Sequence, residues 1–295
     1  MTPHLLFAMV VALQAATTTP DRAGLSADVA ALASAGTNEG RFDALTAMLR
    51  ARNLSFTVEP FSLSRPIGRE PRTEGRNVVV TLGQGAETLI VGAHYDAARL
   101  SDGSLSQGAI DNAASSVILV RLADALRAEA LPARIRVVWF DMEELGLIGS
   151  DRYVQAHAPE RTMGMLNFDV NAYGDTVLYG RSETRENARL RRALVETCAG
   201  EDVPCVGFPQ MPPGDDRTFV ERGIPALSIA ILPAIETHQL WLMVNGGEKA
   251  GLAATPSVVR TIHTSQDAPD KVSEESMATV LRLAVSLVRR LIRGA

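Results

Sequence analysis

The 295-residue sequence has no run of basic residues and no basic patch interleaved with aromatic side chains. Surfaces of that kind neutralise the phosphates of nucleic acids, whereas this chain carries a net charge of −5. We therefore expect no nucleic-acid partner. Internal repeats and low-complexity linkers are also absent, so the sequence shows no domain boundary and predicts a single domain over residues 20–295.

Long hydrophobic runs are scarce, and the one at the N-terminus is short. The uncharged stretch from Leu5 to Leu13 is shorter than the roughly 20 apolar residues that a membrane-spanning helix needs. No lysine or arginine precedes it, and the small residues Ala15 and Ala16 follow. A signal peptide over residues 1–16 therefore fits better than a membrane anchor. This interpretation predicts a periplasmic or secreted protein whose mature chain does not span a membrane.

Cysteine is almost absent, with Cys198 and Cys205 the two examples. If the chain is exported, both would share an oxidising compartment, and a disulfide between them is plausible. Two buried free thiols fit the sequence equally well, because the geometry decides between these alternatives.

Helical and strand patterns alternate along the rest of the chain. Helices are predicted at residues 25–32, 42–53, 112–129, 146–157, 186–198 and from 273 onward. Strands are predicted at residues 55–58, 77–82, 88–93, 134–140, 165–168, 176–179 and 225–231. This alternation predicts an α/β fold with three layers, in which helices cover both faces of a mixed, mostly parallel central sheet.

Five residues of types that bind zinc occur in short segments near the ends of apolar runs: His94, Asp111, Glu144, Asp169 and His263. Four of them, all except Asp111, come after apolar, strand-like runs, and ligands of open α/β sheets bind outside the carboxyl ends of the strands. Acidic residues gathered there would repel one another unless a cation lay among them. The sequence therefore predicts a metal site.

Each of these residues has an ordinary explanation when taken alone. A buried histidine is more often a core residue than a ligand, and Glu143 with Glu144 could be an exposed helix start. The other histidines have less context: His157 reads as a surface residue, and His238 lies in a segment, residues 233–256, that could wall a pocket. The metal hypothesis therefore depends on the set rather than on any single member.

The motifs around these residues resemble the M28-type dinuclear zinc aminopeptidases, a family that includes leucyl aminopeptidases, glutaminyl cyclases and glutamate carboxypeptidase. The similarity runs from about residue 77 to residue 273. Its strongest elements are Gly92-Ala93-His94-Tyr95-Asp96, Gly108-Ala109-Ile110-Asp111-Asn112-Ala113 and the segment from Glu143 to Ser150. The resemblance implies a zinc-exopeptidase-like fold and a cis peptide bond between Asp111 and Asn112.

The resemblance also implies a division of the donor residues between two zinc ions. Asp111 would bridge the ions, His94 and Asp169 would complete one site, and Glu144 and His263 would complete the other. Each ion would then have three protein ligands and an open position, which is typical of catalytic zinc.

By the same resemblance, Glu143 and Asp96 are the catalytic residues. Glu143 would act as general acid/base on a hydroxide held between the two ions. Asp96 would accept the second imidazole N–H of His94 and fix its tautomer. Asp267 could support His263 in the same way.

The resulting expectation is an exported aminopeptidase that removes N-terminal residues from peptides with a free N-terminus. Glutaminyl-peptide cyclase and dipeptidase or carboxypeptidase activities are alternatives within the same family, and a noncatalytic binding module is disfavoured because all five donors and Glu143 are present. A carboxypeptidase or dipeptidase would need a basic pocket, for which the candidates are Arg99, Arg181, Arg217 and Arg260.

The sequence departs from the family pattern in two places. Ala114-Ser115-Ser116 replaces a small residue followed by glycine, and Gly214-Asp215-Asp216-Arg217 stands where the family often has Ser-Asp-His. The second departure makes Asp216 or Arg217 a candidate specificity element. An apolar preference at the substrate N-terminus is suggested only by the segment from Trp241 to Met243.

Overall fold

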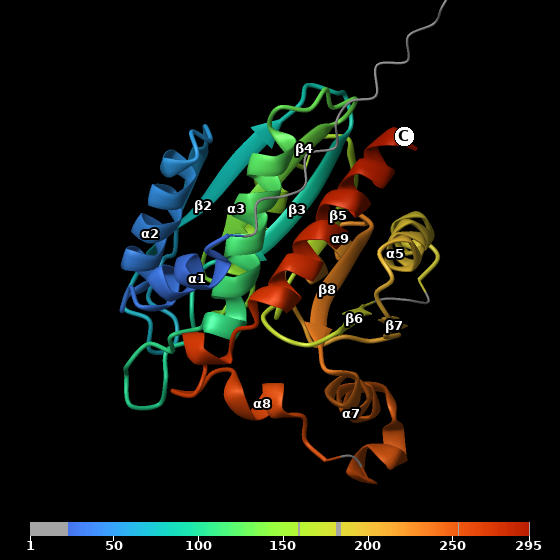
Figure 1. Ribbon diagram of the computed structural model, residues 1–295. Coiled ribbons are helices and arrows are strands. Elements are labelled where there is room, and N and C mark those ends of the chain that lie inside the picture. The colour runs from blue at the N-terminus through green and yellow to red at the C-terminus, as the bar shows by residue number, and fades with distance from the viewer. Residues whose placement is uncertain (1–22, 159, 181–183, 253, 295) are drawn as a thin grey trace, which may run out of the picture.

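The computed structural model describes residues 23–158, 160–180, 184–252 and 254–294 (Figure 1). The predicted signal peptide and Arg181 lie outside these residues. Within the described part of the chain, no helix is long and apolar enough to cross a membrane.

One eight-stranded sheet forms the centre of the molecule, with the strand order β1-β2-β4-β3-β5-β8-β6-β7. The strands are β1 Thr57–Ser62, β2 Glu74–Leu82, β3 Thr88–His94, β4 Arg134–Phe140, β5 Thr162–Phe168, β6 Thr176–Tyr179, β7 Cys205–Gly207 and β8 Ala226–Leu232. Strands β4, β3, β5 and β8 are parallel neighbours, while β2 and β6 pair antiparallel at their flanks. The predicted mixed, mostly parallel sheet is confirmed.

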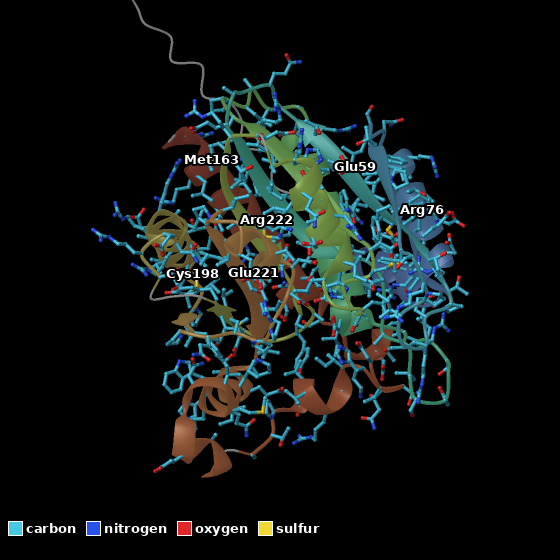
Figure 2. All side chains as sticks on the ribbon, turned by 180° about the vertical axis from the view of Figure 1, so that it is seen from behind. Glu59, Arg76, Met163, Cys198, Glu221 and Arg222 are labelled. Carbon is cyan, nitrogen blue, oxygen red and sulfur yellow. A yellow bond between two sulfur atoms is a disulfide. The ribbon has the colours of Figure 1, made fainter. Side chains whose placement is uncertain are left out.

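Helices cover both faces of this sheet, as the three-layer prediction requires. They are α1 Leu25–Ala33, α2 Asn38–Ala51, α3 Ala114–Leu126, α4 Ile148–Ala156, α5 Ala188–Gly200, α6 Asp216–Val220, α7 Ala234–Asn245, α8 Ser257–Thr261 and α9 Glu274–Arg293. Figure 1 shows α3 and α9 in front of the sheet, with α1 and α2 beside them. Figure 2, drawn from behind, shows α4 as the yellow-green helix on the opposite face.

Alternation along the strands divides the core between the two faces. In β2, Val78 and Val80 pack toward the face that carries α3 and α9, whereas Val79 packs toward the other face. On that other face it joins a smaller cluster with Tyr153 of α4 and Phe219 of α6. The sheet is therefore buried on both sides, which explains why its central strands read as continuous apolar runs.

The element predictions are right for the long segments and incomplete for the short ones. Strands β4 and β6 have the predicted bounds, and α9 begins after its N-cap Ser273, whose hydroxyl accepts a hydrogen bond from the Ser276 amide. Strand β1 lies at residues 57–62 rather than 55–58. Strand β7 and helices α6, α7 and α8 were not predicted, because three to five residues are too few for periodicity and α7 lacks a clear apolar face.

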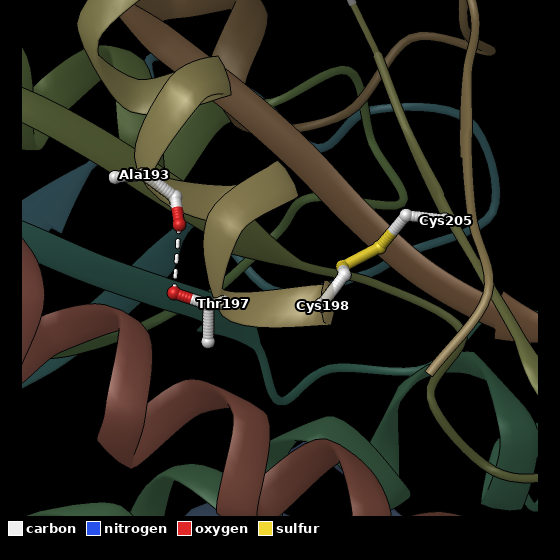
Figure 3. Close-up of a disulfide and its surroundings, with 4 residues drawn as sticks. All are labelled: Ala193, Thr197, Cys198 and Cys205. Carbon is white, nitrogen blue, oxygen red and sulfur yellow. Dashed lines mark hydrogen bonds between the residues drawn. A yellow bond between two sulfur atoms is a disulfide. The ribbon is translucent and has the colours of Figure 1, made fainter. Parts of the chain in front are cut away.

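A disulfide joins Cys198 near the end of α5 to Cys205 at the start of β7 (Figure 3). It closes a short loop, since the two cysteines are 7 positions apart. Beside it, the Thr197 hydroxyl donates to the Ala193 carbonyl at 2.7 Å. Of the two alternatives that the sequence left open, the structure contains the disulfide.

Candidate metal centre

The structure brings the five predicted donor residues together at the carboxyl edge of the parallel strands. His94 is the last residue of β3, Asp169 directly follows β5, and Glu144 lies in the turn after β4. Asp111 lies in η1, a turn of π-helix at Ala109–Ala113 that leads into α3. His263 follows α8. Five different strand or helix ends therefore converge, as expected for a site outside the carboxyl ends of strands.

Two overlapping groups of donors share Asp111. In the first, the Nε2 atom of His94 is 3.0 Å from Asp111 Oδ1 and 3.7 Å from Asp169 Oδ1. In the second, the Nε2 atom of His263 is 3.1 Å from both Asp111 Oδ2 and Glu144 Oε2. The two oxygens of Asp111 thus face one histidine each, and within each group the donor atoms lie within 4.8 Å of one another.

Glu143 lies against the same cluster. One of its oxygens falls within 4.8 Å of donor atoms of His94 and Glu144. Its position next to both groups places a carboxyl group beside the space that they enclose.

The electrostatics of the cluster are those of crowded carboxyl groups. Burial and the charge of Asp111 raise the pKa of Glu144 to about 7. Burial also raises the pKa of Glu143 well above its usual range, and neighbouring carboxylates add to this effect. Burial alone would raise the pKa of Asp111 too, but hydrogen bonds with His263 and His94 hold it below its ordinary value. The site concentrates more negative charge than its histidines balance.

Asp96 lies beside the Nδ1 atom of His94. Its Oδ1 atom is 3.5 Å from Nδ1 of His94, and its backbone carbonyl is 3.2 Å from the same nitrogen. Its carboxylate also accepts hydrogen bonds from the backbone amides of Glu143 and Glu144, at 3.1 and 3.3 Å. One buried carboxylate therefore positions both the β3 and the β4 segments of the site.

Asp267 has a different partner from the one predicted. Its carboxylate accepts hydrogen bonds from the Ile110 and Asp111 amides, at 2.6 and 3.2 Å, rather than supporting His263. The residue fixes the backbone of η1. In the same turn the peptide bond between Asp111 and Asn112 is cis, as predicted. The Asn112 side chain ties this turn to β5 by donating to the Phe168 carbonyl at 2.9 Å and accepting from the Val170 amide at 3.2 Å.

Arg41 is a supporting residue that the sequence analysis missed. This fully buried side chain of α2 donates to the backbone carbonyls of Tyr95, Gln107 and Gly108, at 2.5, 2.7 and 3.2 Å. It therefore joins the segment after His94 to the segment before Asp111. Burial lowers the pKa of Arg41 to about 10, and the carboxylates of the site oppose that decrease. The available signal was position: Arg41 lies four residues before Leu45, on the apolar face of its helix.

Four non-glycine residues at the site have left-handed backbone conformations: Met142, Leu147, Val170 and His263, with φ between 57° and 62°. Such values are uncommon for residues other than glycine and unusual for a β-branched residue such as Val170. They redirect the chain just before Glu143, just after Asp169 and at His263 itself.

A cavity of about 740 Å³ opens onto the cluster. Apart from the donors, its wall includes Leu147, Val170, Leu178, Met211, Arg217, Thr218, Ala230, Leu232, Leu240, Val258 and Ile262. The prediction that residues 233–256 form a wall of the pocket was partly wrong. Leu240 of α7 contributes, but His238 and Trp241 line a separate cavity of about 850 Å³, because the opposite side of α7 faces away from the site.

Most of the other residues predicted for the pocket do not line this cavity. Met243 is 40% exposed and Asp216 is buried, and neither lines the cavity of the site. Arg99 pairs with Glu70, and Arg260 with the Thr255 carbonyl, whereas Arg217 does line the cavity.

His157 is not a free surface residue, since its ring lies between Glu59 and Glu160 at 3.1 and 2.8 Å.

The arrangement of sheet and helices is similar to that of solved zinc-dependent exopeptidases and glutaminyl cyclases. The fold matches a Zn-dependent exopeptidase from Parabacteroides distasonis with a TM-score of 0.73 at 15% identity, over 92% of this chain and 99% of that one. It matches a glutaminyl cyclase from Porphyromonas gingivalis with a TM-score of 0.75 at 16% identity, over 94% and 99% of the two chains. At these identities the likeness concerns the fold.

The family follows from the sequence match. Residues 77–288 match the model of peptidase family M28, and the chain belongs to that family, as the motifs predicted. Among curated proteins, an aminopeptidase of Pseudomonas aeruginosa is 38% identical over 105 residues, which are 34% of this chain and 18% of that protein. Aminopeptidase YwaD of Bacillus subtilis is 32% identical over 90 residues, 30% of this chain and 18% of that protein. The matched segments thus span about a fifth of the length of these relatives.

Proposed function

We propose that this protein is a zinc-dependent aminopeptidase that binds two zinc ions between the described donors. Two nitrogen and three carboxylate donors form two groups of the kind found in zinc sites. The buried atoms Glu144 Oε1 and Asp169 Oδ1 have no hydrogen-bond partner among the described residues, so both are available to a cation. His94 and Asp169 would hold one ion, Glu144 and His263 the other, and Asp111 both.

Zinc bound there would supply a Lewis acid and lower the pKa of a water molecule to about 7. Glu143 is positioned to take a proton from the attacking water and deliver it to the leaving amine. Its carboxyl lies beside the donor cluster, with an oxygen within 4.8 Å of donor atoms of His94 and Glu144. Asp96 would keep His94 in the tautomer that leaves Nε2 free to bind metal.

The single observation that carries this proposal is the sharing of Asp111 by two donor groups at the floor of a cavity with an apolar wall. The excess of carboxylates favours a substrate that brings a cationic amino group, and the apolar wall favours an apolar N-terminal side chain. The relatives from Pseudomonas aeruginosa and Bacillus subtilis are named aminopeptidases, which supports the same assignment.

We also propose that the protein is exported to the periplasm or beyond the cell. The apolar N-terminal stretch supports this location, and so does the disulfide between Cys198 and Cys205, because disulfides persist in oxidising compartments.

A substrate panel with one active-site variant tests the proposed activity. We expect the zinc-loaded protein to cleave leucyl-p-nitroanilide and not its N-acetylated form. Glu143→Gln should lower kcat by about 10²-fold or more, because general acid–base catalysis contributes that much, while zinc content stays near two ions per chain. The panel also includes a peptide with N-terminal glutamine.

The outcomes separate the alternatives. Cleavage of N-blocked substrates alone would exclude an aminopeptidase, and cyclisation of the glutamine peptide without hydrolysis would identify a glutaminyl cyclase. Loss of zinc from Glu143→Gln would make Glu143 a ligand rather than the acid/base.

A further inference from the structure

The cavity at the proposed active site has two walls of different chemistry. Strands β6 and β8 and helix α7 contribute the apolar residues Leu178, Ala230, Leu232 and Leu240. Helices α4 and α6, which pack against each other on the far face of the sheet, contribute Asp151, Arg217, Thr218 and Glu221. Figure 2 shows the far face, with Glu221 labelled at the end of α6. A peptide bound across the donor cluster would therefore meet an apolar wall and a polar wall.

Charge is unevenly distributed on this cavity. The carboxyl groups that line it are Asp111, Glu143, Glu144, Asp151, Asp169 and Glu221. Of the described residues that line it, Arg217 is the one lysine or arginine. A carboxylate on a substrate would be repelled by much of the wall, and Arg217 offers it a guanidinium partner.

Arg217 is held in a position suited to that task. Its Nε atom donates to Glu221 Oε1 at 2.8 Å, one helical turn away. Its two terminal nitrogens have no partner among the residues that the structure describes, and about half of the side chain is exposed (53%). Glu221 thus orients the guanidinium and leaves its outer N–H groups free for a bidentate contact with a carboxylate.

We propose that Arg217 binds a carboxylate on the leaving part of the peptide and so makes short peptides with a free C-terminus preferred substrates. The inference rests on the proposed aminopeptidase function. In a dipeptide the C-terminal carboxylate lies one residue beyond the bond that is cleaved, and a cavity of about 740 Å³ has room for a short peptide. The carboxylate of an acidic side chain at the same position has the same chemistry.

The experiment compares leucylglycine, leucylglycinamide and leucylglutamic acid α-amide as substrates. For the wild-type protein, kcat/KM should be about tenfold higher for leucylglycine than for its amide, the effect of one favourable charged contact. Arg217→Gln should remove most of this ratio through KM, and Arg217→Lys should keep part of it. The third substrate shows whether a side-chain carboxylate is also recognised.

Arg290→Gln is the matched control. Arg290 of α9 has a similar exposure, pairs with Glu196 at 2.9 Å, and neither residue lines the cavity. It should leave the acid-to-amide ratio unchanged. Thermal unfolding of both glutamine variants verifies that the fold is intact.

The result that overturns the inference is an equal acid-to-amide ratio in the wild type and in Arg217→Gln. A preference for the glutamyl amide that Arg217→Gln abolishes supports the carboxylate site and identifies the side chain as a second source. If leucyl-p-nitroanilide is cleaved but wild type does not favour the free acid, this inference fails and the proposed function stands. If no unblocked substrate is cleaved, the proposed function itself fails.

Discussion

His157 connects residues that are far apart in the sequence. Its Nε2 atom lies 3.1 Å from Glu59 Oε1 on β1, and its Nδ1 atom lies 2.8 Å from Glu160 Oε1. The hydrogen bond with Glu59, together with that to Glu160, raises the pKa of His157 above its ordinary value of 6.5, while burial and the guanidinium of Arg136 oppose the shift. In its protonated form the ring donates to both carboxylates and links the end of α4 to the edge of the sheet, while Nη1 of Arg136 lies 2.6 Å from the same Nδ1.

This contact makes stability depend on pH. Because the pKa of His157 is higher in the folded state than in the unfolded chain, its stabilisation is fully present below the unfolded value of about 6.5 and is lost as the pH rises through the folded value. We expect urea unfolding to show wild type more stable than His157→Gln at about pH 5.5, and the difference to shrink by about pH 9. A difference of the same size at both values would contradict this role.

Individual residues also show which parts of the site could be predicted from the sequence. His94, Asp111 and Asp169 could be chosen because they lie in short motifs at strand or helix ends, where backbone geometry fixes the position of a side chain. Arg41 could be placed on the apolar face of its helix, but its role could not be predicted, because its partners are backbone carbonyls more than 50 positions away and no local pattern encodes such contacts. Asp267 was recognised as a supporting residue, but which backbone it supports depends on tertiary packing.

At the scale of elements, α2 holds two segments of the site in place by hydrogen bonds. It does so although it lies before residues 77–288, the region that matches the family model. Besides the contacts of Arg41, the Asn38 side chain accepts from the Ala97 amide at 2.9 Å and donates to its carbonyl at 3.3 Å. The two residues hold the chain after β3 and the approach to η1 against one helix.

Arg41→Met removes the hydrogen bonds that Arg41 donates to the backbone of the site, and it adds no polar group. Three backbone carbonyls lose their donor, so we expect a loss of about 3 kcal/mol in the free energy of unfolding. Zinc affinity, measured by competition with a chromophoric chelator, should fall by about 10- to 100-fold, as for other residues that support ligands.

Arg121→Met is the comparison for this effect. Arg121 is also buried, but it pairs with Asp28 of α1, away from the site. Its loss should lower stability and leave the zinc affinity of the folded protein near that of wild type. Equal zinc affinities in wild type and Arg41→Met would show that α2 only stabilises the fold.

The accuracy of the element predictions follows from length and environment. Helix α3 and strands β3 and β4 are buried along most of their length. Their apolar residues therefore indicated a helix and two strands clearly. Helices α7 and α8, which contribute Leu240 and Val258 to the cavity, and Ile262 just after α8 lie in a segment whose apolar residues face several directions. The substrate wall was consequently the part of the site that the sequence predicted least well.

At the scale of the whole molecule, the proposed zinc ions should contribute to stability. A ligand that binds only the folded chain adds about 2.7 kcal/mol when its concentration is 100 times its dissociation constant. For a protein of this size that corresponds to a rise of about 4–5 °C in Tm. We expect chelation by 1,10-phenanthroline to lower Tm by this amount, and added Zn²⁺ but not Mg²⁺ to restore it. A Tm that chelation leaves unchanged would argue against the proposed metal site.

The contact between Asp267 and η1 has a consequence for the timing of folding. His94 and Asp111 are synthesised in the first half of the chain, whereas His263 and the Asp267 carboxylate that fixes η1 come near its end. A chain still emerging from the ribosome therefore lacks the second histidine and the residue that orders the shared carboxylate. The second donor group can be completed only after synthesis has passed residue 263, and the contact that fixes the shared Asp111 only after residue 267, so we expect any zinc that the site binds to be bound late in synthesis or after it.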